Sequence, residues 1–211
     1  MDASFWHEKW AKNEIAFHGS EANPLLVQSF DRLALAPGSR VFVPLCGKTL
    51  DIHWLLGNGY RVAGAELSKA AIGQLFAELG VEPRISPVGA MERYSAECID
   101  IFAGDFFALS REMLGPVDAV YDRAALVALP EETRTRYAAH LRAITGEAPQ
   151  LLVCYEYDQS KVEGPPFSVS EAETRRHYDQ AYNLRLLSSV HTPAGLRGKH
   201  DATEHVWLLT K

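Results

Sequence analysis

Short apolar runs alternate along this chain with longer segments of helical periodicity, and no other feature constrains the fold as strongly. The runs at 40–45, 61–65 and 98–102 are short enough to be buried strands, and helical patterns at 49–57 and 68–79 follow the first two. Parallel strands joined by crossover helices give this order, because such strands are buried on both faces. The sequence therefore predicts a doubly wound, mostly parallel α/β sheet.

The same alternation continues in the second half of the chain. Apolar runs at 117–121 and 151–157 predict two more strands, separated by a helical pattern at 130–144. Two later runs, 184–190 and 206–209, are spaced like an antiparallel hairpin that closes the sheet. Together the runs predict a seven-stranded sheet that ends in a C-terminal antiparallel hairpin.

The length of 211 residues suits one domain, because a single hydrophobic core stops growing only well beyond this size. Helical patterns at 4–13 and 24–33 precede the first predicted strand. We therefore expect 1–211 to form a single domain, with 1–36 as an N-terminal helical cap.

Charge and cysteine content exclude several classes of protein. The formal net charge of −6 has the wrong sign for a protein that neutralises many phosphates, so we expect no nucleic-acid partner. Cys46, Cys98 and Cys154 suit neither a disulfide framework nor a metal knuckle, and the eight histidines lack metal-ligand spacing. No apolar run reaches the roughly 18 residues of a membrane span. We expect a cytoplasmic monomer with no metal site and no membrane partner.

Polar residues follow the predicted strands at the edge where doubly wound sheets bind their ligands. Glu66 lies 66 − 45 = 21 residues beyond Leu45, the end of the first strand. At this spacing nucleotide-binding folds place a carboxylate that accepts hydrogen bonds from both ribose hydroxyls. A second interpretation is that Glu66 is an acid that favours the positive end of the next helix.

The loop after the first strand lacks a phosphate-binding motif. Gly47, Lys48 and Thr49 follow one another as in a phosphate loop, but Phe42 stands where that motif needs glycine, and the chain has no GxGxxG. A cofactor with a ribose but without phosphates therefore fits better than a nucleotide triphosphate or a dinucleotide. Gly47 would let the backbone approach such a ligand, or it marks an ordinary tight turn.

Two further strand ends carry candidate residues. Asp105 beside Phe106 could accept a hydrogen bond from an adenine amine while the aromatic ring covers the base, or Asp105 could cap a short helix. Arg123 would rarely lie at a buried strand end without a carboxylate, and we expect Asp122 to pair with it.

Tyr157 and Lys161 match the YxxxK pattern of short-chain dehydrogenases. That pair must share one helical face, and Gly164 with the prolines at 165–166 ends any helix here. We interpret the match as chance.

Several motifs taken together resemble one family. From Phe5 to Lys211 the chain contains FWHEKW with AFH, VPLCGK, GAELS, GDFFAL, YDRAAL, EYDQ and EGPPFSV. In this it resembles the thiopurine S-methyltransferases, a branch of the class I, Rossmann-like, S-adenosylmethionine-dependent methyltransferases. The resemblance is to the compact bacterial form, without the longer N-terminal extension of mammalian enzymes.

The resemblance implies a cofactor, S-adenosyl-L-methionine, whose product is S-adenosyl-L-homocysteine, and a role for each matching residue. The cofactor-binding positions match Trp10, Leu45, Glu66, Asp105, Phe106 and Arg123. Phe17 matches a residue near the methyl acceptor, and Arg197 is the nearest match to a second arginine at the substrate. The N-terminal cap would fold over the cofactor site.

The implied reaction is transfer of a methyl group to the sulfur of a small aromatic or heterocyclic thiol such as a thiopurine. We expect Arg123 to favour the thiolate and Asp122 to orient Arg123. Bacterial relatives are linked to selenium and tellurium compounds, which could also be acceptors. The sequence leaves open a methyltransferase for halide or thiocyanate, a nicotinamide oxidoreductase, and a binding module without turnover.

Overall fold

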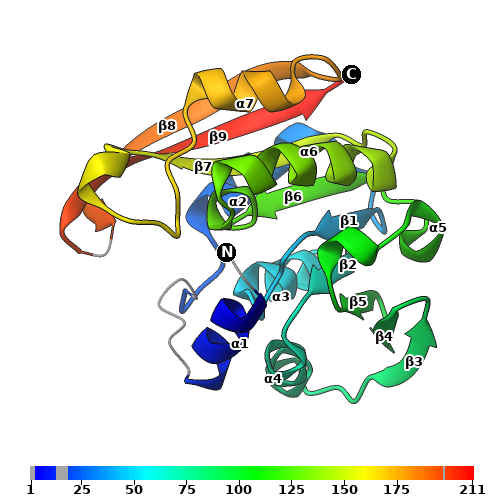
Figure 1. Cartoon of the computed structure of the whole chain (residues 1–211). Helices are drawn as coiled ribbons and strands as arrows, with labels where there is room; N and C mark the ends of the chain where they lie inside the picture. The colour runs from blue at the N-terminus through cyan, green and yellow to red at the C-terminus, as the bar shows by residue number, and fades with distance from the viewer. Residues whose placement is uncertain (1–2, 13–18, 197) are drawn as a thin grey trace.

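The computed structural model describes residues 3–12, 19–196 and 198–211. In it the chain forms a single mixed sheet with helices on both faces (Figure 1). The strands are β1 Arg40–Val43, β2 Arg61–Glu66, β3 Arg84–Val88, β4 Met91–Ala96, β5 Ile99–Ala103, β6 Ala119–Arg123, β7 Gln150–Glu156, β8 Asn183–Leu196 and β9 His200–Thr210. The α-helices are α1 Ala3–Ala11, α2 Pro24–Ser29, α3 Leu50–Gly57, α4 Lys69–Leu79, α5 Arg111–Leu114, α6 Glu131–Thr145 and α7 Glu171–Tyr178. Short 3-10 helices are η1 Phe30–Leu33, η2 Phe106–Ala108, η3 Leu126–Ala128 and η4 Gln159–Lys161.

The strand order is β3-β4-β5-β2-β1-β6-β7-β9-β8. The five strands from β5 to β7 are parallel, and an antiparallel hairpin, β8–β9, closes one side. The predicted doubly wound sheet with its C-terminal hairpin is therefore confirmed. The carboxyl ends of β5, β2, β1 and β6 meet at one edge, because these four neighbours all run the same way.

The count of seven strands is wrong, because the described chain has nine. The two missed strands, β3 and β4, form an antiparallel hairpin on the edge of the sheet beside β5. Edge strands need no continuous apolar run, and β3 contains Pro87, which sequence patterns count against a strand. Most β3 residues are exposed or only partly buried, so the hydrophobic pattern is weak there.

Side chains that point alternately to the two faces of each buried strand divide the core into two layers. Val41 and Val43 of β1 pack on one face with residues from α2, α3 and α4, whereas Phe42 packs on the other face with residues from α5, α6 and α7. Successive side chains of a strand point to opposite faces, so each buried strand contributes to both layers.

Side-chain caps fix where α3 and α4 begin, beside the carboxyl ends of β1 and β2. The Thr49 side chain accepts a hydrogen bond from the N–H of Asp51 at the start of α3, and Ser68 accepts one from Ala71 at the start of α4. Such caps satisfy backbone N–H groups that a helix cannot pair internally. The predicted helices at 49–57 and 68–79 are confirmed, with Thr49 and Ser68 as their N-caps rather than their first helical residues.

No helix in the described ranges combines the length and hydropathy needed to cross a membrane.

Candidate active site

Glu66 ends β2 with a carboxylate that joins two loops. Its Oε2 accepts a hydrogen bond from the backbone N–H of Gly47 at 2.8 Å, and its Oε1 accepts one from Ser68 at 2.7 Å. Burial of the side chain, only 6% exposed, raises the pKa of the carboxyl, although the N–H groups of Ser68, Gly47 and Leu67 partly offset this. A carboxylate has about four acceptor positions, so Glu66 keeps capacity for further donors.

The loop after β1 is held against the N-terminal helix. Leu45 and Gly47 have positive φ angles of 46° and 52°, and the Cys46 N–H donates to the carbonyl of Ala65 at 3.0 Å. A Cβ atom added to Gly47 would lie 2.9 Å from Cζ2 of Trp10. Only glycine fits this contact without moving the indole. The structure therefore brings Trp10, Leu45 and Glu66 together, while their contacts with the cofactor stay a prediction.

Asp105 and Phe106 follow β5 beside the end of β2. The Gly104 N–H donates to the backbone carbonyl of Glu66 at 2.9 Å, which holds the two strand ends together. Asp105 is exposed and caps η2 by accepting a hydrogen bond from the N–H of Phe107 at 2.9 Å. Phe106 is buried, with its ring centroid 5.0 Å from that of Tyr137. The structure thus shows Asp105 as a helix cap, while its adenine contact stays a prediction.

Asp122 does not pair with Arg123, so that prediction is wrong. Both residues lie inside β6, and neighbouring residues of a strand point to opposite faces. The Asp122 carboxylate accepts hydrogen bonds from the Tyr137 hydroxyl at 2.7 Å and the Leu126 N–H at 3.1 Å. Complete burial raises the pKa of Asp122 to about 6, although these donors and the N–H of Ala125 oppose the shift.

Arg123 instead has Tyr155 of β7, Glu204 of β9 and Asp51 of α3 in its electrostatic surroundings. Burial disfavours the cation, but the oxygens of Tyr121, Tyr155, Asp51 and Glu204 outweigh this and raise the pKa of Arg123. The Nε atom of Arg123 is buried and has no hydrogen-bond partner in the described chain. A buried donor without a partner is costly, so the Arg123 Nε carries a desolvation penalty that no described contact offsets.

Asp51 is a residue that sequence reasoning missed. Its Oδ1 accepts a hydrogen bond from the backbone N–H of Asn23 at 2.6 Å, and its Oδ2 accepts one from the Tyr121 hydroxyl at 3.0 Å. The carboxylate therefore ties the segment before α2 to β6, next to Arg123. In the sequence Asp51 is an ordinary acid in the first turn of a helix, and nothing local shows its distant partners.

The remaining predicted residues divide into two groups. Phe17 and Arg197 lie outside the described residues. Tyr157 precedes η4 and donates to the carbonyl of Pro166 at 2.6 Å, while Lys161 is paired with Asp158 at 3.4 Å. Tyr157 and Lys161 therefore share no helix, in agreement with the interpretation of YxxxK as a chance match.

The chain is similar to known methyltransferases over its whole length. The family model described as thiopurine S-methyltransferase matches residues 1–211. A protein of Xanthobacter autotrophicus named thiopurine S-methyltransferase is 58% identical over 212 residues, covering 100% of both chains. A protein of the same name from Teredinibacter turnerae is 51% identical over 211 residues, covering 100% of this chain and 98% of the relative.

Solved structures show the same fold. The 1,6-didemethyltoxoflavin-N1-methyltransferase of Burkholderia thailandensis, solved with S-adenosylhomocysteine, matches with a TM-score of 0.66 at 15% identity, covering 99% of this chain and 87% of that one. The magnesium protoporphyrin IX methyltransferase of Synechocystis, also solved with S-adenosylhomocysteine, gives 0.65 at 14% identity over 100% of both chains. At these identities the likeness concerns the fold alone.

Proposed function

Since the chain belongs to the thiopurine S-methyltransferase family, we propose that it transfers a methyl group from S-adenosylmethionine to the sulfur of small aromatic or heterocyclic thiols. The observation that carries the proposal is the match of the family model to all of residues 1–211. The buried Glu66 carboxylate at the carboxyl end of β2 supports it independently, because a phosphate-free nucleoside needs such an acceptor.

The described residues fit S-adenosylmethionine. Glu66 would accept hydrogen bonds from the ribose hydroxyls, and Trp10 would place an aromatic face near the sulfonium, where cation–π attraction is favourable. The unpartnered Nε of Arg123 provides a donor for a carboxylate or another acceptor. Leu45, Asp105 and Phe106 surround the same strand ends. When bound, S-adenosylmethionine supplies the methyl group on a positively charged sulfonium.

Arg123 would act on the methyl acceptor. A thiol must lose its proton to solvent before its sulfur attacks the methyl carbon, and a neighbouring guanidinium favours the thiolate. The new carbon–sulfur bond forms as the sulfonium carbon–sulfur bond breaks, so opposite charges disappear together. Excluding water and aligning the two sulfur atoms would therefore supply much of the acceleration. Phe17 and Arg197 are the proposed acceptor contacts.

The N-terminal segment would serve as the cap of this site. Its support is the contact of Trp10 with Gly47 and the hydrogen bond from Asn23 to Asp51. Both contacts attach residues of 1–36 to the loop and helix that follow β1. Asp122 would act more remotely than proposed from the sequence, by holding the turn at 124–126 after Arg123 through the N–H groups of Ala125 and Leu126.

We further propose that the protein is a cytoplasmic monomer. Three unpaired cysteines, Cys46, Cys98 and Cys154, support a reducing compartment. The large exposed apolar side chains lie on several elements, with Val27 on α2, Ile85 on β3 and Leu186 and Val190 on β8, which supports a monomer. Sedimentation analysis would measure the oligomeric state directly.

Calorimetric titration tests the cofactor, and acceptor competition tests the substrate. S-adenosylmethionine and S-adenosylhomocysteine should bind in the micromolar range, whereas NADH should not. A thiopurine should then suppress methylation of thiocyanate in a mixed assay. Binding of NADH alone would indicate an oxidoreductase. Preferred methylation of thiocyanate or halide would show that the acceptor is a small anion rather than a thiol. Cofactor binding without turnover would indicate a binding module.

A further inference from the structure

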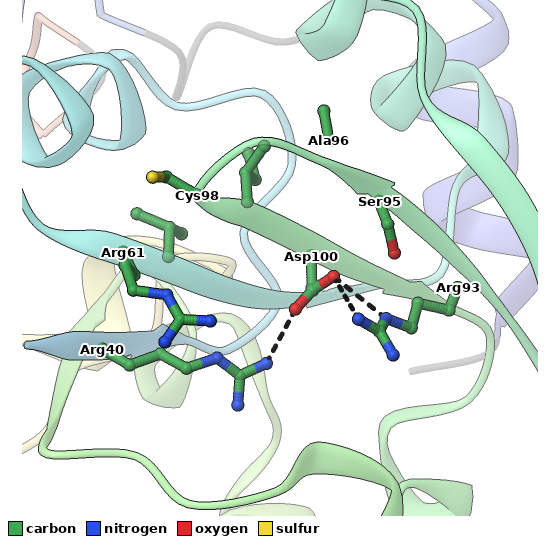
Figure 2. A pocket seen from close by; sticks show the side chains of 9 residues that line it. Arg40, Arg61, Arg93, Ser95, Ala96, Cys98 and Asp100 are labelled. Carbon is green, nitrogen blue, oxygen red and sulfur yellow. Dashed lines mark hydrogen bonds and ion pairs between the residues drawn. The ribbon is translucent and has the colours of Figure 1, made fainter. Parts of the chain in front are cut away.

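A polar cavity lies at the edge of the sheet where the parallel strands begin (Figure 2). It has a volume of about 150 Å³ and forms where β1, β2 and β5 begin, with β4 beside them. Its charged lining residues are Arg40, Arg61, Arg93 and Asp100. Three positive charges and one negative charge leave a formal net charge of +2 (3 − 1). Parallel strands begin and end at opposite edges, so this cavity is separate from the candidate active site.

Asp100 holds two of the arginines in fixed positions. Its Oδ2 lies 3.1 Å from Nη2 of Arg40, and its Oδ1 lies 2.9 Å from both Nε and Nη2 of Arg93. Arg40 also donates from Nη1 to the carbonyl of Leu114 at 2.6 Å. Figure 2 shows the Arg40 and Arg93 guanidiniums on two sides of the Asp100 carboxylate. The cavity is therefore preorganised by the contacts of Arg40 and Arg93 with Asp100 and of Arg40 with the Leu114 carbonyl.

Arg61 adds a positive charge for which no described residue supplies an ion-pair partner. It is the register partner of Arg40 in the parallel pair of β1 and β2, and its exposed guanidinium lies beside that of Arg40 in Figure 2. No hydrogen bond or ion pair connects the Arg61 side chain to another described residue. Burial lowers the pKa of Arg40, and the charges of Arg61 and Arg93 add to this against the opposing effect of Asp100. Like charges side by side on a sheet are unfavourable unless an anion joins them.

We propose that this cavity binds a phosphate group, held by the guanidiniums of Arg40, Arg61 and Arg93. A phosphate dianion matches the net charge of the lining, and planar guanidiniums suit its tetrahedral oxygens. The volume of about 150 Å³ compares with about 30 Å³ for one water in the liquid, so a group of five heavy atoms fits. The ligand would join the first residues of β1 and β2 to the β4–β5 hairpin and so stabilise the native state.

The phosphate group could come from inorganic phosphate or from a phosphomonoester. Thermal unfolding of the full-length chain distinguishes these sources when it is followed in increasing inorganic phosphate or glycerol 3-phosphate, with sodium chloride keeping the ionic strength constant. At least one of the two should raise the unfolding temperature along a saturating curve. The more effective compound identifies the source. No S-adenosyl compound is present, so the result is independent of the proposed function.

Arg61→Ala is the decisive variant, because it removes a cation without breaking a described side-chain contact. The apparent affinity for the effective compound should fall about tenfold, as for the loss of one charge-assisted hydrogen bond. Arg185→Ala, an exposed arginine on the far edge strand β8, is the matched control and should bind as the wild type does. The proposal is overturned if neither compound stabilises the wild type beyond chloride, or if Arg61→Ala responds like the wild type.

Discussion

Glu66 accepts a hydrogen bond from the backbone N–H of Gly47 at 2.8 Å, and this contact joins the ends of two neighbouring parallel strands. The carboxylate that would bind the ribose is therefore also the group that fixes the loop after β1. Because Gly47 packs on Trp10, the position of the N-terminal helix depends on the same loop. We therefore expect substitutions at Glu66 or Gly47 to affect both the affinity for the cofactor and the packing of the N-terminal helix.

Replacing Glu66 by glutamine should weaken binding of S-adenosylhomocysteine by about 1–3 kcal/mol, the range for losing a charged hydrogen-bonding group. Glutamine has one acceptor oxygen for the N–H groups of Gly47 and Ser68 and offers less to the ribose. Isothermal titration calorimetry measures the change. Because the Glu66 pKa is raised, wild-type affinity should fall on acidification at a higher pH than an ordinary glutamate would give.

Glu82→Gln provides the control for this substitution, because Glu82 is exposed beyond the end of α4. Its affinity should equal that of the wild type. An unchanged affinity in Glu66→Gln would remove Glu66 from the cofactor site.

Gly47→Ala should destabilise the fold by more than backbone strain alone. A left-handed conformation costs a residue with a Cβ atom roughly 1–2 kcal/mol, and the new Cβ would also press on the Trp10 ring. Gly59→Ala is the matched control, since Gly59 has a φ of +81° and open space around the added Cβ. Chemical unfolding measures both variants.

The excess cost of Gly47→Ala over Gly59→Ala should disappear when Trp10 is also replaced by alanine, because the clash is then removed. Equal costs for the two glycine variants, or additive costs for Gly47→Ala and Trp10→Ala, would separate the N-terminal helix from the loop.

Arg123→Lys should raise the pH at which turnover is half-maximal. Lysine keeps the charge but presents a compact, strongly hydrated ammonium, so it favours the thiolate less than the fixed guanidinium does. A pH profile of methyl transfer measures the shift. Arg142→Lys is a suitable control, because Arg142 on α6 also has a buried, unpartnered Nε but lies at the far end of its helix. Superimposable profiles for Arg123→Lys and the wild type would make Arg123 a structural residue.

Asp122→Asn should remove a pH dependence of stability. The pKa is about 6 in the folded protein against an ordinary 3.8, so the native state keeps a proton that the unfolded state releases. The wild-type free energy of unfolding therefore falls as the pH rises from 3.8 to 6. Relative to Asp122→Asn the change should be about 2 kcal/mol, measured by urea unfolding at both ends of this window. A difference independent of pH would contradict the raised pKa.

Burial on both faces explains why the centre of the fold could be predicted from the sequence. Strands β1, β2, β5, β6 and β7 all read as apolar runs, and their shared direction places Glu66 beside the loop that contains Leu45 and Gly47. The β3–β4 hairpin could not be predicted in the same way, because edge strands bury too little apolar surface to leave a pattern.

Side-chain direction explains the errors at the site. The predicted strand at 117–121 ends two residues too early, which places Asp122 and Arg123 in a loop where neighbours can pair. Inside β6 they face opposite layers. Asp51 was missed for a different reason, since its partners Asn23 and Tyr121 lie 28 and 70 residues away and leave no local pattern.

Mass spectrometry of the methyl acceptor tests the central claim most directly. The full-length protein is incubated with S-adenosylmethionine and, separately, with a thiopurine, thiophenol, thiocyanate and iodide, and the product of each is identified. We expect S-methylated thiopurine and thiophenol to form with the wild type and to be strongly reduced with Glu66→Gln. Saturable binding of S-adenosylmethionine without methylation of either thiol would contradict the proposed function.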